Sequence, residues 1–170
     1  MARIILIYGL IAGSVVALVS FGSLALFSDG EIPAGSQWLG YSIMVIALSV
    51  IFFAVKGYRD QQLGGVIKFW TALKLGAGIS LVAGVAYALG WELYYQTLGG
   101  EFMQQYALSY LEQMRADGAT AAEVETARQR MADFEKLYSL LPARFGITLV
   151  EILPVGLFIS LLSAALLRKH

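Results

Sequence analysis

The sequence predicts an all-α membrane protein with four transmembrane helices and an extracytoplasmic helical hairpin between the third and fourth spans. Hydrophobic residues make up 58% of the 170 residues, charged residues only 14%, and the mean hydropathy is +0.70, well outside the average for soluble proteins. Four apolar runs approach the roughly 20 residues that cross a bilayer core. A polar segment with helical periodicity separates the last two runs. We therefore expect residues 1–170 to form a single membrane domain with one insert, residues 100–141.

The four spans follow in order along the chain. The first, about residues 4–27, has an apolar core too long for a cleaved signal peptide, so we expect a retained helix. The second covers about residues 39–55. The third covers about residues 66–95, because the amphipathic sequence VIKFWTALK extends its apolar run into the headgroup layer. The fourth covers about residues 145–167. An even number of spans places both termini on the same side.

The connecting segments differ in charge, which predicts the orientation. If both termini and the loop KGYRDQQLGG share one side, the only acid there is Asp60, and the other side holds eleven of the twelve acids. The basic residues on the first side are Arg3, Lys56, Arg59, Lys68, Lys74, Arg168 and Lys169. The positive-inside rule then makes both termini cytoplasmic and places the insert outside the cytoplasm.

The insert carries two helical patterns separated by a stop signal. The first pattern consists of Met103, Ala107, Tyr110 and Met114, at spacings of four, three and four. Asp117-Gly118 ends this helix, and Thr120 with Glu123 forms a capping box for the next one. The second pattern consists of Val124, Ala127, Met131, Phe134, Tyr138 and Leu141. Pro142 is expected to end the second helix, which completes an antiparallel hairpin.

Two kinds of surface either pack the chain or bind a second protein. The apolar faces of the two hairpin helices either pack against each other like a short coiled coil or leave Phe102, Tyr106 and Tyr110 exposed as aromatic anchors for a partner. Small residues recur every four positions in two spans, which lets helix backbones approach closely. These rows are Gly76, Ser80, Gly84 and Ala88 in the third span, and Gly9, Gly13 and Ala17 in the first. They either pack a four-helix bundle or form the seam of a homo-oligomer.

Two carboxylates lie within the predicted spans. Glu92 continues the Gly76 row near the outer end of the third span, among aromatic residues typical of the membrane interface. Glu151 lies six residues past Phe145, about 9 Å into the apolar layer. A charge at that depth costs about 2 to 3 kcal/mol on insertion scales, so Glu151 must be protonated or paired.

Pro154 and Arg144 bear on the state of Glu151. Pro154 has no amide hydrogen, so the carbonyl of Val150 loses its helical partner and the helix tends to kink. Arg144 lies two turns toward the outside on the same helical face, where it can reach an ionised Glu151. Glu151, Pro154, Glu92 and Arg144 therefore form either a structural polar knot or a proton or ligand site.

A second candidate site is the basic loop between the second and third spans. Lys56 and Arg59 can meet anionic lipid headgroups, while Asp60 can pair with a basic neighbour or cap the following helix. Together with Tyr58, these residues form either a membrane anchor or a cytoplasmic docking loop.

Several functional classes lack the residues that they need. The chain has no cysteine and its single histidine is His170, so we expect no disulfide and no zinc site. No internal histidine stands beside a serine as a base, and no glycine loop has the spacing that binds phosphate. No basic patch indicates nucleic-acid binding. We expect no enzyme activity, no metal and no cofactor.

Three stretches of the chain carry a family resemblance: GYSIMVIALSVIFFAVKGYRD, QQLGGVIKFWTALKLG and VEILPVGLFISLLSAALL. They resemble DUF4199, a family of bacterial integral membrane proteins of unknown function, over nearly the whole chain. The resemblance rests on Lys56, Tyr58, Arg59, Asp60 and Gly65, and on Glu151, Pro154, Val155 and Gly156. It implies a four-span protein of the bacterial inner membrane with an outer helical insert, and it implies no activity.

Two functions fit these observations. The first is a non-enzymatic accessory or scaffold subunit whose periplasmic hairpin contacts a partner protein. The second is a small proton-, ion- or lipid-handling membrane protein that uses Glu151. A scaffold should copurify with its partner, whereas a carrier should show a polar cavity that reaches Glu151.

Overall fold

The structure, a computed structural model, describes residues 1–26, 36–98 and 100–168. Its regular elements are all helices, which confirms the all-α class. They are α1 (Ala2–Leu26), α2 (Ser36–Leu48), α3 (Val50–Gln62), α4 (Phe69–Leu98), α5 (Gly100–Ala116), α6 (Ala121–Ser139) and α7 (Leu141–Leu167). Four stretches are long and apolar enough to cross a membrane: Ala2–Gly22, Gly40–Gln62, Phe69–Thr97 and Leu141–Leu167. The chain is therefore a multi-pass membrane protein with the four expected spans.

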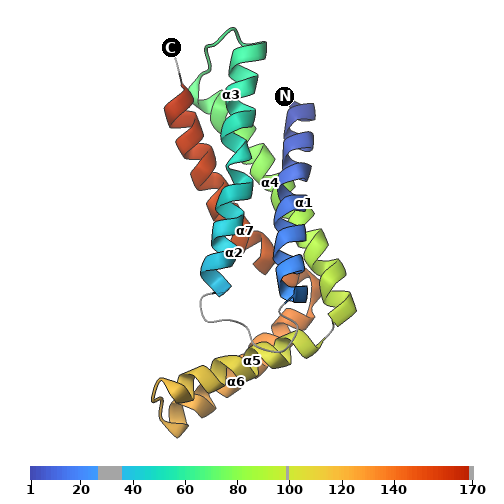
Figure 1. The fold of residues 1–170 in the computed structure, drawn as a ribbon, viewed down its shortest axis with the longest axis vertical. Coiled ribbons are helices and arrows are strands. Elements are labelled where there is room, and N and C mark those ends of the chain that lie inside the picture. Colours follow the sequence, from blue (N-terminus) through green and yellow to red (C-terminus); the bar gives the residue numbers. More distant parts are fainter. Residues whose placement is uncertain (27–35, 99, 169–170) are drawn as a thin grey trace.

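Helix α4 is the centre of the bundle, and α1 and α7 pack against it more extensively than any other helices do. The start of α1 and the end of α7 lie at one end of the bundle, while α5 and α6 leave from the opposite end (Figure 1). Every span contributes fully buried apolar side chains: Val16, Leu48, Ile51, Leu75, Ile79 and Ile152. The core is thus shared by all four spans.

Helices α1 and α4 run in the same direction and interlock in one register. The pairs in order are Ile5–Gly78, Gly9–Val82, Gly13–Ala86 and Ala17–Gly90. A Cβ atom added at Gly13 would lie 2.8 Å from the Cβ of Ala86 and even closer to the backbone carbonyl of Ala83. Side chains and backbone of α4 therefore occupy the space beside the small residues of α1, and the glycine row of α1 packs within the chain.

The second span is longer than the predicted segment 39–55. Helices α2 and α3 follow each other with an interruption at Ser49, whose hydroxyl donates to the carbonyl of Ile46 (2.6 Å). Helix α3 then continues to Gln62, because the stretch KGYRDQQ contains no proline and its single glycine costs a helix only about 1 kcal/mol. The chain turns at Gly64 and Gly65, where φ is +64° and +88°, values that glycine adopts without strain. Most of the predicted basic loop is therefore the last two turns of a helix.

Helices α5 and α6 contact each other through Leu111, Val124 and Ala127, which are buried. The face of α5 differs from the predicted stripe, because Leu111 points to α6 while Tyr110 remains 43% exposed. Both residues fit a helical period, so spacing alone does not separate them. The side chains of Phe102 and Met103 lie outside the described residues.

The predicted capping box at the start of α6 is confirmed. The backbone amide and the hydroxyl of Thr120 each donate to the Glu123 carboxylate at 2.8 Å, and the Glu123 amide donates to the Thr120 hydroxyl (3.4 Å). The hydrogen bond from the Thr120 amide, followed by the one from its hydroxyl, lowers the pKa of Glu123. The charged carboxylate therefore holds the first turn of α6.

The boundary between α6 and α7 also differs from the prediction. Helix α6 ends at Ser139, before Pro142, and Leu140 is extended (φ −79°, ψ 119°). Pro142 instead lies in the first turn of α7, where its missing amide hydrogen leaves no helical carbonyl unsatisfied. Helix α7 therefore starts at Leu141, earlier than the predicted residue 145, and it runs through Pro154 as one element.

Candidate functional site

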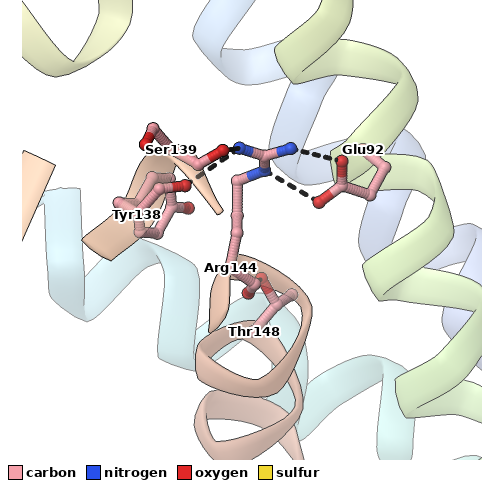
Figure 2. A network of polar contacts seen from close by, with 5 residues as sticks. All are labelled: Glu92, Tyr138, Ser139, Arg144 and Thr148. Carbon is pink, nitrogen blue, oxygen red and sulfur yellow. Dashed lines mark hydrogen bonds and ion pairs between the residues drawn. The ribbon is translucent and has the colours of Figure 1, made fainter. Parts of the chain in front are cut away.

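Glu92 and Arg144 form a buried ion pair at the end of the bundle that carries α5 and α6 (Figure 2). The Arg144 guanidinium donates from Nε to Oε1 of Glu92 (2.8 Å) and from Nη2 to Oε2 (2.7 Å). The two residues are only 6% and 5% exposed. Two parallel charge-assisted hydrogen bonds make this a strong and geometrically specific contact. The partner of Arg144 in the structure is therefore Glu92, and not Glu151, which the sequence offered as a partner in the case of an ionised carboxylate.

The ion pair ends a regular ladder between α4 and α7. The contacts in order are Gly76–Ser160, Ser80–Gly156, Gly84–Ile152 and Glu92–Arg144. Each step of four along α4 meets a step of four back along α7, so the helices are antiparallel. A Cβ atom added at Gly156 would lie 2.7 Å from the Cβ of Ser80, an approach typical of small-residue helix interfaces in membranes. The register of the ladder thus brings Glu92 opposite Arg144.

Arg144 also fastens α6 to the bundle. Its Nη1 donates to the backbone carbonyls of Tyr138 (2.9 Å) and Ser139 (3.4 Å), at the end of α6. Carbonyls in the last turn of a helix have no partner within that helix. The guanidinium carbon also lies 3.9 Å from the ring centroid of Tyr95, within the range of a cation–π contact. Figure 2 shows the guanidinium between α4 on one side and α6 on the other.

Aromatic rings surround the ion pair. The cluster consists of Phe21 from α1, Trp91, Tyr94 and Tyr95 from α4, and Tyr138 from α6. Burial raises the pKa of Tyr138 to about 12, although a hydrogen bond with Trp91 and the charge of Arg144 act in the opposite direction. Tyr138 is therefore neutral at physiological pH. The rings shield the ion pair from solvent, which strengthens its attraction, and aromatic residues of this kind are enriched at membrane interfaces.

Glu151 and Pro154 take no part in the hydrogen bonds described above, although the charge of Glu151 adds to the rise in the pKa of Tyr138. Both residues are exposed on the surface of α7, whereas the face of α7 that meets α4 carries Arg144, Thr148 and Ile152. The structure therefore divides the four predicted site residues into a buried pair and an exposed pair. It does not gather them into one polar knot.

The second candidate site, Lys56 to Asp60, lies on α3 at the end of the bundle where α1 starts and α7 ends (Figure 1). Arg59 donates to the Asp60 carboxylate (2.6 Å) and to the carbonyl of Leu167 in the last turn of α7 (3.5 Å). Arg59 therefore joins the end of α3 to the end of α7, as basic residues commonly do at helix C-termini. Lys56 is exposed, and Tyr58 is half-buried against the core.

The chemistry of the buried network favours fastening over catalysis. Arg144 stays charged at every physiological pH, and it directs its donors to Glu92 and to the end of α6. Among the described residues, no group of three or more His, Cys, Asp or Glu side chains could hold a metal ion. The network joins α4, α6 and α7 at one point.

Sequence reasoning missed the pairing although it named both residues. The signal was a second row with a step of four on the last span, which consists of Arg144, Thr148, Ile152, Gly156, Ser160 and Ala164. Matched in the antiparallel sense against the Gly76 row, it pairs Glu92 with Arg144. Sequence reasoning matched Arg144 with Glu151, seven residues along the same helix, and did not examine the row with a step of four.

The chain was compared with known proteins. No curated protein and no solved structure matches it. The family model described as "Protein of unknown function (DUF4199)" matches residues 7–169. Because that match covers nearly the whole chain, this four-span protein belongs to the DUF4199 family.

Proposed function

We propose that this protein is a non-enzymatic accessory or scaffold subunit of the bacterial inner membrane, which presents α5 and α6 in the periplasm to a partner protein. The observation that carries this proposal is the double role of Arg144, which bonds Glu92 of α4 and the last carbonyls of α6. A projecting helix pair that is fixed to its bundle loses little freedom on binding, and such preorganisation favours affinity.

The charge pattern supports the orientation. Arg59 contacts the carbonyl of Leu167, and Arg168 follows directly after α7, so both lie at the end of the bundle where α7 ends and α1 starts (Figure 1). Lys56 precedes Arg59 by one turn of α3. The α5–α6 pair lies at the other end and carries fewer basic residues, which are Arg115, Arg128, Arg130 and Lys136. The positive-inside rule then places α5 and α6 on the periplasmic side.

The surface proposed for the partner is an open cleft of about 390 Å³ between α5 and α6. Its lining consists of Tyr110, Met114, Ala122, Glu123, Thr126, Ala127, Arg130 and Met131. Methionine side chains adapt to the shape of a bound surface, and tyrosine and arginine are enriched among residues that dominate binding energy. The cleft therefore suits an apolar side chain of a partner protein.

Replacing Tyr110 with alanine tests this proposal. Truncating a central aromatic residue of an interface costs about 2 kcal/mol, which corresponds to roughly 30-fold weaker binding. We expect the amount of partner protein that copurifies with the tagged chain from native membranes to fall by a similar factor. Quantitative mass spectrometry measures this amount. The control variant is Glu135→Ala, because Glu135 is exposed on α6 and lies outside the cleft lining. It should copurify the partner as the wild type does. Equal yields from both variants would reject the cleft as the contact surface.

A second candidate function, proton or ion handling by Glu151, is favoured by one observation. Glu151 is exposed on an apolar spanning helix, and Arg144, the nearest basic residue before it in α7, is committed to Glu92. In the apolar part of a membrane, a carboxyl group costs less free energy in its protonated form than in its ionised form. Such a group could bind and release a proton at the membrane surface of the bundle.

A hydrophobic carbodiimide tests this second candidate in native membranes. The reagent adds to a protonated carboxyl to give an O-acylisourea, which rearranges to a stable N-acylurea. We expect mass spectrometry of the digested protein to find the adduct on Glu151 and not on the ion-paired Glu92. Glu151→Gln should abolish the adduct and leave thermal stability unchanged. An unlabelled Glu151 would eliminate the candidate, and a less stable glutamine variant would give Glu151 a structural role.

A further inference from the structure

Three leucines are exposed where α6 passes into α7. Leu137, Leu140 and Leu141 have exposed fractions of 49%, 58% and 54%. Leu137 and Leu141 are one turn apart in sequence, and Leu140 lies in the short extended link between the helices. Three exposed leucines therefore lie within five residues of one another in sequence at the base of the α5–α6 pair.

The length of α7 gives the depth of these leucines. Its 27 residues span about 40 Å, whereas the hydrocarbon core of a bilayer is about 30 Å thick. If this excess length is shared equally between the two ends of α7, about 5 Å of helix, or three residues, lies outside the hydrocarbon core at each end. Leu141 then lies among the lipid headgroups and Arg144 lies at the edge of the hydrocarbon.

The neighbours of the three leucines agree with this depth. Trp91 and Tyr95, residue types enriched at membrane interfaces, lie beside the Glu92–Arg144 pair. Below them, Val150 is 70% exposed on the part of α7 that crosses the membrane, so apolar side chains of this helix face lipid there. The three leucines therefore lie at the level where the lipid-exposed part of α7 ends.

We propose that Leu137, Leu140 and Leu141 insert into the boundary between headgroups and acyl chains of the bilayer. The base of α6 thereby rests on the membrane, as the apolar face of an interfacial helix does. The α5–α6 pair runs obliquely away from the bundle (Figure 1), so the turn at residues 117–120 is its far end. The partner of these leucines is the lipid itself, whereas the cleft near Met114 and Met131 stays in the aqueous phase.

The absence of cysteine from the chain makes a direct test straightforward. Single variants Leu137→Cys, Leu140→Cys and Leu141→Cys carry a nitroxide label in nanodiscs of phosphatidylethanolamine and phosphatidylglycerol. Collision with oxygen, which concentrates in lipid, and with a water-soluble nickel chelate is measured by electron paramagnetic resonance. Matched controls are Lys136→Cys and Asp133→Cys, whose side chains are each 79% exposed on the same helix.

We expect the ratio of oxygen to nickel collisions to be several-fold higher at the three leucine positions than at the two controls. Nickel access as high at residues 137, 140 and 141 as at 133 and 136 would overturn the proposal. Binding of a partner protein to the three leucines would also overturn the proposal. In that case the nickel chelate would reach the labels in nanodiscs, but neither reagent would reach them in native membranes. Where a label unfolds the protein, tryptophan introduced at the same position gives the same comparison. Its quenching by brominated lipid is measured as the excess over the unsubstituted chain, which has three tryptophans of its own.

Discussion

Replacing Arg144 with methionine is expected to lower the free energy of unfolding by about 3 kcal/mol, because it leaves the Glu92 carboxylate buried without its partner. The same change removes the donor to the carbonyls of Tyr138 and Ser139. The last turn of α6 should therefore lose protection from hydrogen exchange while the middle of α4 keeps it. Unfolding in mixed micelles with increasing dodecyl sulfate, followed by circular dichroism, measures the stability. Mass spectrometry of the α6 peptide measures the exchange.

A double variant separates the two roles of Arg144. Glu92→Leu combined with Arg144→Met replaces the ion pair by apolar side chains of similar volume, which is often neutral or stabilising. We expect it to recover most of the lost stability. The end of α6 should still exchange rapidly, because methionine donates nothing to the Tyr138 carbonyl. If Arg144→Met matches the wild type in both measurements, the ion pair does not fasten α6 and the scaffold proposal loses its main support.

The spans could be predicted because each one has to meet the length and apolarity of the bilayer by itself. The end of α3 could not, because hydropathy records apolar character while a helix can continue through polar residues. Lys56 and Asp60 are compatible with a helix, and the chain turns only at Gly64 and Gly65. The predicted loop was therefore too long by two helical turns.

The partner of Arg144 could not be predicted from either helix alone. It depends on the register between two spans whose paired residues are 52 positions apart. On α4 the small residues of the row are easily seen, but on α7 Ile152 interrupts the corresponding row. A similar ambiguity affected α5, where Leu111 and Tyr110 are adjacent and both fit a helical stripe. Local patterns locate the faces of helices, and tertiary packing selects among them.

The close packing of α4 also bears on oligomerisation. The small residues of its two rows meet Ser160 and Gly156 of α7 on one side and the glycine row of α1 on the other. Close helix approach of this kind needs small residues at the contact, and here the contacts within the chain occupy them. The α5–α6 cleft, not these rows, is therefore the surface that we expect a second protein to use.

Gly13→Ala is expected to destabilise the protein by about 2 to 3 kcal/mol. The added Cβ would lie 2.8 Å from the Cβ of Ala86. It would lie closer still to the carbonyl oxygen of Ala83, which belongs to the α4 backbone and cannot rotate away. Overpacking a tight contact costs about 1 to 3 kcal/mol, and the rigid neighbour places this site at the upper end. Thermal unfolding of the purified protein in one detergent measures the loss.

Gly22→Ala is the matched control in the same helix. Among the atoms that the structure describes, none lies within 4 Å of a Cβ added there, so we expect only the backbone effect of removing a glycine. That effect stabilises a helix by about 0.5 to 1 kcal/mol. Opposite shifts of the unfolding midpoint for Gly13→Ala and Gly22→Ala would therefore establish that α1 meets α4 through Gly13. Two similar shifts would mean that the α1–α4 register is wrong, because no other difference between the two glycines predicts opposite signs.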